Sequence, residues 1–233
     1  MEPKSNAPLL PDGTPNLRKF AAIADYPVFV WINGLDKGYH MVEISRYAYG
    51  ELPVPHFSLI TVQFERPLTI AAHFDAQLAQ SISVATYKRN EGFQSPLPLM
   101  FDSMSAAGGL VLHGDWLKLP SELEFMRDPM QHRVQWPQFV DLVSKQPKEH
   151  LEASSIWFEY YSWQGEASIS LAYGETAEAQ VVVVGMAVSP EEFRESLSAL
   201  TPIQELDAGR IDSLQAELVD AHSQRYRPRG TNR

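Results

Sequence analysis

The chain has 233 residues, and its apolar fraction of 44% and charged fraction of 21% are ordinary for a globular protein, which argues against wholesale disorder. It contains no cysteine, so disulfide scaffolds, thiolate metal sites and cysteine nucleophiles are excluded together. No apolar run approaches the ~18 residues of a membrane span, and no basic-then-apolar signal opens the sequence, so we expect a cytoplasmic protein without membrane association.

The net charge of −10 is concentrated in the C-terminal third of the chain. Residues 1–55 sum to −1, residues 56–150 to −2 and residues 151–233 to −7. Between residues 152 and 220, two arginines oppose thirteen acidic side chains. A protein-wide field that attracts phosphates is therefore excluded, whereas a local basic surface on the nearly neutral middle segment is not.

Proline, glycine and charge divide the chain into three parts. Residues 1–16 hold four prolines and are expected to form an extended arm, and residues 17–224 form a single domain. Within this domain, Pro53-Val54-Pro55 marks the end of an N-terminal subregion at about residue 55. Residues 225–233 carry four arginines and form a basic tail, which we interpret as a solvated chain end.

The first elements of the domain are a helix and two strands. Apolar spacing predicts a helix over Asn16–Tyr26 and a strand over Pro27–Ile32. The turn dipeptide Asn33-Gly34 follows, and a second strand over His40–Tyr49 is close enough to form a hairpin with the first.

The middle of the chain mixes strand and helix signals. A strand over Phe57–Phe64 is interrupted at Pro67, and a helix opens at Asp75 and runs through Leu78 and Ile82. A further helix is predicted between Ser121 and Gln135, which Pro129 would end.

The C-terminal third has the clearest pattern. Strands are predicted over Ile156–Trp163 and Ser168–Tyr173, followed by a turn at Gly174-Glu175, and Val181–Val184 has the composition of a buried central strand. Two helices follow, one capped by Ser189 with a capping box completed by Glu192, and one with an apolar stripe of Ile211, Leu214 and Leu218. This mixture of hairpins and helices predicts an α+β fold with an antiparallel or mixed sheet covered by helices.

Two His-x-Asp triplets, His73-Phe74-Asp75 and His113-Gly114-Asp115, could together hold a divalent metal that activates water. Asp75 is also a helix-capping residue type, and Gly114-Asp115 is a common turn pair. We favour these structural roles and expect no metal and no cofactor.

Nucleophile and nucleotide motifs are weak or missing in this sequence. The small-residue loop Ser103–Gly109 lacks the Gly-x-Ser-x-Gly elbow, and no phosphate-binding Gly-rich motif occurs. A non-catalytic protein is favoured, and an enzyme built on the His-x-Asp triplets ranks third among the hypotheses.

Basic residues of the middle segment occur in small groups beside aromatic residues, a mixture that single-stranded RNA binding uses. The alternative is solvated surface. The aromatic run between Trp157 and Trp163 spans both faces of its strand, so one face must pack in the core while the other could stack bases or receive a partner. The candidate RNA contacts are Arg66, His73, Tyr87, Lys88, Arg89, Arg127, His132 and Arg133.

Four segments of the middle region occur in the order of a known family. They are 60–67 (ITVQFERP), 72–79 (AHFDAQLA), 97–99 (LPL) and 109–116 (GLVLHGDW). In this order they resemble the opening of the RAMP-superfamily subunit that caps the crRNA 5′ handle in CRISPR effector complexes, especially the type IV kind. The resemblance implies a ferredoxin-like (RRM-like) core, no cofactor, and guide RNA bound as part of a complex with other protein subunits.

Two function classes follow. The leading hypothesis is a non-catalytic RNA-binding subunit of an RNA-guided, CRISPR-type nucleoprotein complex in antiviral defence. The alternative is an acidic protein-interaction or immunity-type protein, whose charged C-terminal helices bind a basic partner.

Overall fold

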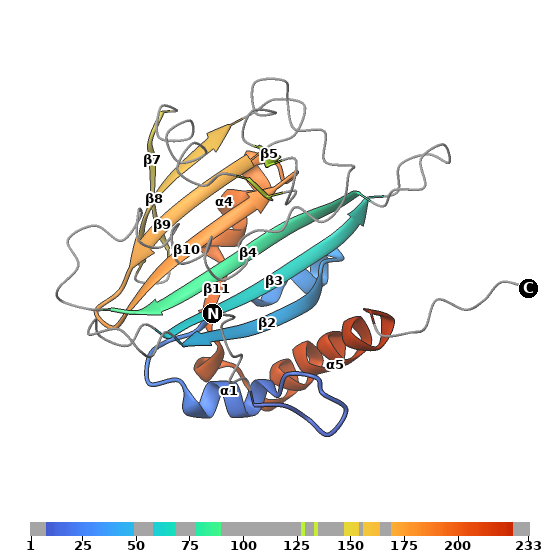
Figure 1. Cartoon of the computed structure of the whole chain (residues 1–233). Helices are drawn as coiled ribbons and strands as arrows, with labels where there is room; N and C mark the ends of the chain where they lie inside the picture. The colour runs from blue at the N-terminus through green and yellow to red at the C-terminus, as the bar shows by residue number, and fades with distance from the viewer. Residues whose placement is uncertain are drawn as a thin grey trace, which may run out of the picture.

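A seven-stranded antiparallel sheet forms the centre of the molecule (Figure 1). The structure is a computed structural model, and it describes residues 8–48, 58–68, 78–89, 127–128, 133–134, 147–153, 156–163 and 169–225. The strand order is β2-β3-β4-β10-β9-β8-β7. The strands are β2 (His40–Ala48), β3 (Ser58–Leu68), β4 (Leu78–Lys88), β7 (Glu149–Ala153), β8 (Ile156–Trp163), β9 (Ile169–Glu175) and β10 (Ala179–Met186).

Helices and short strands surround this sheet, so the α+β class predicted from the sequence is confirmed. The large sheet joins two meanders, β2-β3-β4 and β7-β8-β9-β10, through the pairing of β4 with β10. These connections do not establish the ferredoxin-like form of the class, which stays a prediction. The other elements are α1 (Leu17–Ile23), β1 (Phe29–Trp31), η1 (Ile32–Lys37), β5 (Arg127–Asp128), β6 (Arg133–Val134), α4 (Pro190–Ser198), β11 (Leu200–Pro202), η3 (Ile203–Glu205) and α5 (Ala208–Arg225).

The four-valine strand is the middle strand of the sheet, as predicted. β10 pairs with β4 on one side and with β9 on the other. Val181 and Val183 point to the face that carries the main core, and Val182 and Val184 to the opposite face, yet all four are at most 1% exposed. Burial on both faces explains why this strand reads as a continuous apolar run.

Helix α4 begins as its sequence predicted and packs across the core face of β10. The Ser189 hydroxyl accepts a hydrogen bond from the Glu192 amide at 3.1 Å, and Pro190 occupies the first turn. Among the described residues the Glu192 carboxylate bonds Arg66 rather than returning to the cap, so half of the predicted capping box forms. Phe193 lies against Gly185, where an added Cβ would be 2.6 Å from the Phe193 ring.

Replacing Gly185 with alanine is therefore expected to lower the free energy of unfolding by about 1–3 kcal/mol, because the ring must move out of a packed site. This is the opposite of the small gain that Gly→Ala usually gives within a strand. Chemical denaturation of Gly185→Ala, Phe193→Leu and the double variant measures the effect. The cost of Gly185→Ala should shrink in the Phe193→Leu background, whereas additive costs would contradict the contact.

The two ends of the described chain pack together at the β2 edge of the sheet. Helix α5 lies along β2, and α1 lies against α5 (Figure 1). The Gln215 side chain joins them, since it accepts from the Leu17 amide and donates to the Pro15 carbonyl, both at 2.9 Å. The described part of the predicted N-terminal arm, residues 8–16, is a loop closed by a bridge between Leu9 and Pro15.

The helix predicted from Asp75 through Leu78 and Ile82 is wrong where the structure describes it. Leu78–Lys88 is strand β4, which pairs with β3 and β10 on its two sides. A spacing of four residues from Leu78 to Ile82 fits a strand as well as a helix. Ile82, Val84 and Thr86 are β-branched and favour a strand. All residues from Ile82 to Thr86 are buried, so both faces of this strand pack inside the protein.

Three other local predictions are corrected. β1 does not form a hairpin with β2, since it pairs with β11 near the other end of the chain. Strand β3 continues through Pro67, which still pairs with Ala79 of β4. The pairing of β3 with β2 ends at Glu65, so Pro67, which has no amide hydrogen, breaks no hydrogen bond to β2. Gly174 and Glu175 lie in β9 rather than in a turn, since they pair with β8 and β10. The glycine is needed for close packing, because a Cβ at Gly174 would be 2.5 Å from the Ile156 side chain.

The region predicted as a helix between Ser121 and Gln135 contains strands β5 and β6 where it is described. They pair Arg127 with Val134 and Asp128 with Arg133, consistent with Pro129 as a residue that cannot continue a helix. Segments 97–99 and 109–116 and both His-x-Asp triplets lie outside the described residues. None of the described helices is long and apolar enough to cross a membrane.

Candidate functional site

The candidate RNA contacts do not form one surface where they are described. Arg66 faces Gln80 across the β3–β4 pair, whereas Lys88 lies at the far end of β4. At about 3.3 Å per residue, Gln80 and Lys88 are roughly 26 Å apart along β4, so Arg66 and Lys88 are separated by a similar distance. Arg127 and Arg133 lie on β5 and β6, whose side chains are not described, and His73 and His132 lie outside the described residues.

Arg66 is part of a structural network. Its guanidinium donates to Gln80 Oε1 at 2.7 Å, to the Lys37 carbonyl at 3.0 Å and to Glu192 Oε2 at 2.9 Å. It also lies over the Tyr39 ring, 4.4 Å from the centroid. The Arg66 side chain is 27% exposed, and these contacts join β3 to β4, η1 and α4. Binding to a phosphate would require giving some of them up.

Lys88 and Arg89 are exposed, but their side chains make contacts on different elements. The Lys88 ammonium forms an ion pair with Asp25, just before β1. The Arg89 guanidinium donates to the Thr176 carbonyl at 2.9 Å, in the turn between β9 and β10. Tyr87 is 3% exposed and so presents little of its ring to a base.

Among the aromatic residues of β8 whose side chains are described, Trp157 is the exposed one, at 54% exposure. Its ring stacks on His150 of β7, with centroids 5.5 Å apart, and Glu152 and Glu175 are its direct neighbours on the two adjacent strands. Phe158 is buried, as expected for the packed face. The flanking carboxylates make this surface a poor match for phosphates.

Carboxylates dominate the C-terminal elements, and some are paired with cations from earlier in the chain. Among the described residues, Lys148 pairs with Glu159, Arg66 with Glu192, Lys37 with Glu195, Arg18 with Asp212 and His40 with Glu217. Glu152, Glu178, Glu191 and Glu205 have no ion-pair partner within the described part of the chain.

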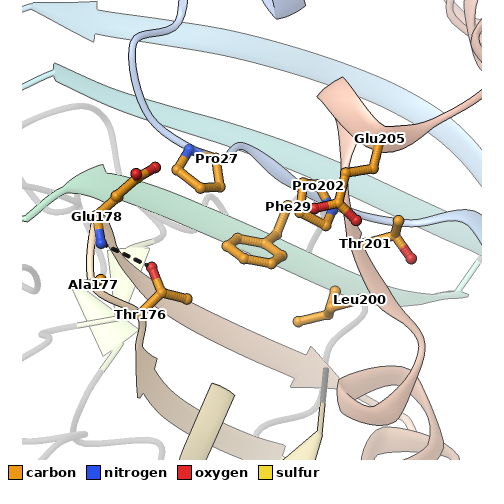
Figure 2. A pocket seen from close by; sticks show the side chains of 9 residues that line it. All are labelled: Pro27, Phe29, Thr176, Ala177, Glu178, Leu200, Thr201, Pro202 and Glu205. Carbon is orange, nitrogen blue, oxygen red and sulfur yellow. Dashed lines mark hydrogen bonds between the residues drawn. The ribbon is translucent and has the colours of Figure 1, made fainter. Parts of the chain in front are cut away.

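A pocket of about 590 Å³ lies between the β1–β11 ribbon and the turn that joins β9 to β10 (Figure 2). Pro27, Ala177 and Pro202 provide the accessible apolar lining, and Phe29 and Leu200 lie beneath it at 2% and 1% exposure. The exposed carboxylates of Glu178 and Glu205 come from opposite walls, as Figure 2 shows. The remaining lining residues are Thr176 and Thr201.

Sequence reasoning missed this pocket. Its walls come from residues 27–29, 176–178 and 200–205. The β1–β11 pairing joins the first and last of these, and the bond from the Phe29 amide to Thr86 of β4, the neighbour of β10, places them near the β9–β10 turn. The one signal available beforehand was the excess of acidic residues after residue 151.

No His, Asp and Glu side chains of the described ranges gather in a group of three that could hold a metal ion. The His-x-Asp triplets are outside these ranges.

Comparison with known proteins gives no match: no family model, no curated protein and no solved structure is similar to this chain. The resemblance to the crRNA-handle subunit therefore stays a prediction.

Proposed function

We propose that this chain is an acidic protein-interaction protein that binds a positively charged protein partner. The observation that supports it is the set of exposed carboxylates without ion-pair partners among the described residues, two of which line the pocket. A surface of this sign speeds encounter with a basic partner and selects it over acidic ones. The cytoplasmic location expected from the sequence is part of the same proposal.

The placement of the cations favours a protein partner over RNA. Lys88 and Arg66 already bind carboxylates, so a phosphate would have to compete with Asp25 and Glu192 for them. Such an exchange yields less free energy than pairing a free cation with a phosphate. Of the candidate cations whose side chains are described, Arg89 is the one without a carboxylate partner, and a single phosphate contact gives weak binding.

Reversal of Lys88 and Arg89 to glutamate separates the two function classes, because the expected effects have opposite signs. If the partner is a basic protein, the double variant should bind a labelled arginine-rich peptide at least as tightly as the unchanged chain does. If the partner is RNA, the variant should lose affinity for a labelled single-stranded RNA, with the salt slope flattened by roughly one unit per lost contact.

Fluorescence anisotropy at about 50 and 200 mM salt measures both probes, with a melting curve for every variant. Arg194→Glu with Arg210→Glu is the matched control, since it makes the same charge change at exposed positions on α4 and α5. Saturable peptide binding without RNA binding supports the proposal. RNA binding that only the Lys88/Arg89 reversal removes would replace it with the nucleoprotein function, and binding of neither probe would also overturn it.

A further inference from the structure

The pocket between the β1–β11 ribbon and the β9–β10 turn has walls held by internal hydrogen bonds. The Thr176 amide donates to the Ala179 carbonyl at 2.8 Å, and the Thr176 hydroxyl accepts from the Ala179 amide at 2.9 Å. On the other wall, the Phe29 amide donates to the Thr86 hydroxyl at 3.2 Å. A site whose walls are already ordered loses little conformational entropy when it is filled.

The polar groups of this pocket are suited to accept hydrogen bonds. The Thr176 hydroxyl donates to the Ala179 carbonyl at 3.3 Å, and the Thr201 hydroxyl to the Ala199 carbonyl at 3.5 Å. Both hydroxyl protons are thus used within the chain. The remaining side-chain polar groups of the lining are the carboxylates of Glu178 and Glu205, which are acceptors only.

Two cations lie beside this pocket, and neither forms an ion pair with its carboxylates. The Arg89 guanidinium donates to the carbonyl of Thr176, a residue of the pocket wall, at 2.9 Å. Lys88 lies opposite Ala179 in the β4–β10 register, yet its ammonium binds Asp25, two residues before Pro27 of the pocket wall. Neither Glu178 nor Glu205 has an ion-pair partner in the described part of the chain. The pocket therefore combines an apolar lining with two carboxylates that are not ion-paired, and Arg89 on its wall offsets part of their negative charge.

We propose that this pocket receives an arginine side chain of the partner protein, an inference that rests on the proposed function. The methylene groups of arginine would lie against Pro27 and Pro202, the half-buried apolar residues of the lining, while the guanidinium reaches toward the carboxylates, the usual placement of a long basic side chain. The planar guanidinium matches the geometry of a carboxylate with two parallel donors, which a lysine ammonium does less well. Arginine residues of this kind are common binding hot spots.

The test uses three blocked tripeptides, acetyl-Gly-X-Gly-amide with arginine, lysine or citrulline at X. Citrulline has nearly the shape of arginine but no charge. The backbone amide signals of Ala177, Glu178 and Thr201 in the full chain are followed by NMR during each titration. The arginine peptide should shift these signals in a saturable way, the lysine peptide more weakly, and the citrulline peptide not at all.

Two double variants locate the binding. Glu178→Gln with Glu205→Gln should weaken binding of the arginine peptide roughly tenfold, as expected for the loss of a charge-assisted pair. Glu152→Gln with Glu191→Gln removes the same charge outside the pocket and should change the dissociation constant less than about twofold. Both carry substitutions at exposed positions, and their melting curves should match that of the unchanged chain.

Equal shifts with citrulline, or equal losses in the two double variants, would overturn the pocket assignment. Failure of the pocket and failure of the proposed function are distinguishable. If the arginine-rich peptide binds the chain but the pocket signals do not move, only the pocket inference falls. If that peptide does not bind at all, the proposed function falls with it.

Discussion

Val183→Asp is expected to abolish soluble folding of the chain. Val183 is 0% exposed in the middle strand of the sheet, next to β4 and β9, so the new carboxylate would be buried without a partner. An unpaired buried charge costs several kcal/mol, which is a large part of the total stability of a domain. Expression in the soluble fraction, circular dichroism and thermal melting measure the result.

Trp157→Asp is the matched control for this prediction. It introduces the same side chain into the same sheet at a position that is 54% exposed, where the carboxylate stays solvated. Loss of the His150 stack, together with the neighbouring carboxylates of Glu152 and Glu175, should lower the free energy of unfolding by about 1–2 kcal/mol, and the variant should still fold. A soluble Val183→Asp protein that melts at the temperature of the unchanged chain would contradict the central placement of β10.

Arg66→Met should lower the free energy of unfolding by about 2–4 kcal/mol. The substitution leaves Glu192, 16% exposed, without its cation, and it removes the donors to Gln80 and to the Lys37 carbonyl. A partly buried carboxylate left without a partner keeps its desolvation cost, which accounts for most of the expected loss. Chemical denaturation gives the free energies of unfolding, with one m-value (the dependence of that free energy on denaturant concentration) fitted to all variants.

Arg18→Met tests whether burial is the reason. The Arg18–Asp212 pair is 55% and 62% exposed at its two side chains, so its loss should cost about 0–1 kcal/mol. If the two substitutions cost the same, the network around Arg66 does not hold β3, β4 and α4 together. Arg66 would then be available as an exposed cation, as the RNA-binding hypothesis requires.

The parts of the fold that the sequence predicts correctly depend on local signals. Ser189 and Pro190 mark the start of α4 through groups within one helical turn, and the valine run of β10 reports burial on both faces. The apolar stripe of α5 likewise places Leu214 and Leu218 in the core. Each signal lies within a short window, and neighbours along the chain decide its outcome.

The errors have a different origin. β1 pairs with β11, 171 positions away between Val30 and Thr201, and no local pattern encodes such a pairing. In β4, the four-residue spacing from Leu78 to Ile82 fits both a helix and a strand, and the pairing with β3 and β10 makes this segment a strand. The site was missed for the same reason, since Phe29, Glu178 and Glu205 share a pocket only after the distant strands have paired. For the cations, sequence shows charge but not the carboxylate that binds each one.

The most direct test of the acidic interaction function is co-expression of the full chain with the product of each adjacent gene, followed by size-exclusion chromatography at low and high salt. The account predicts a stoichiometric complex with a basic protein that dissociates as salt rises and has the absorbance ratio of protein alone. A chain that elutes alone at low salt with every neighbour, or a complex that retains RNA after the high-salt wash, would contradict it.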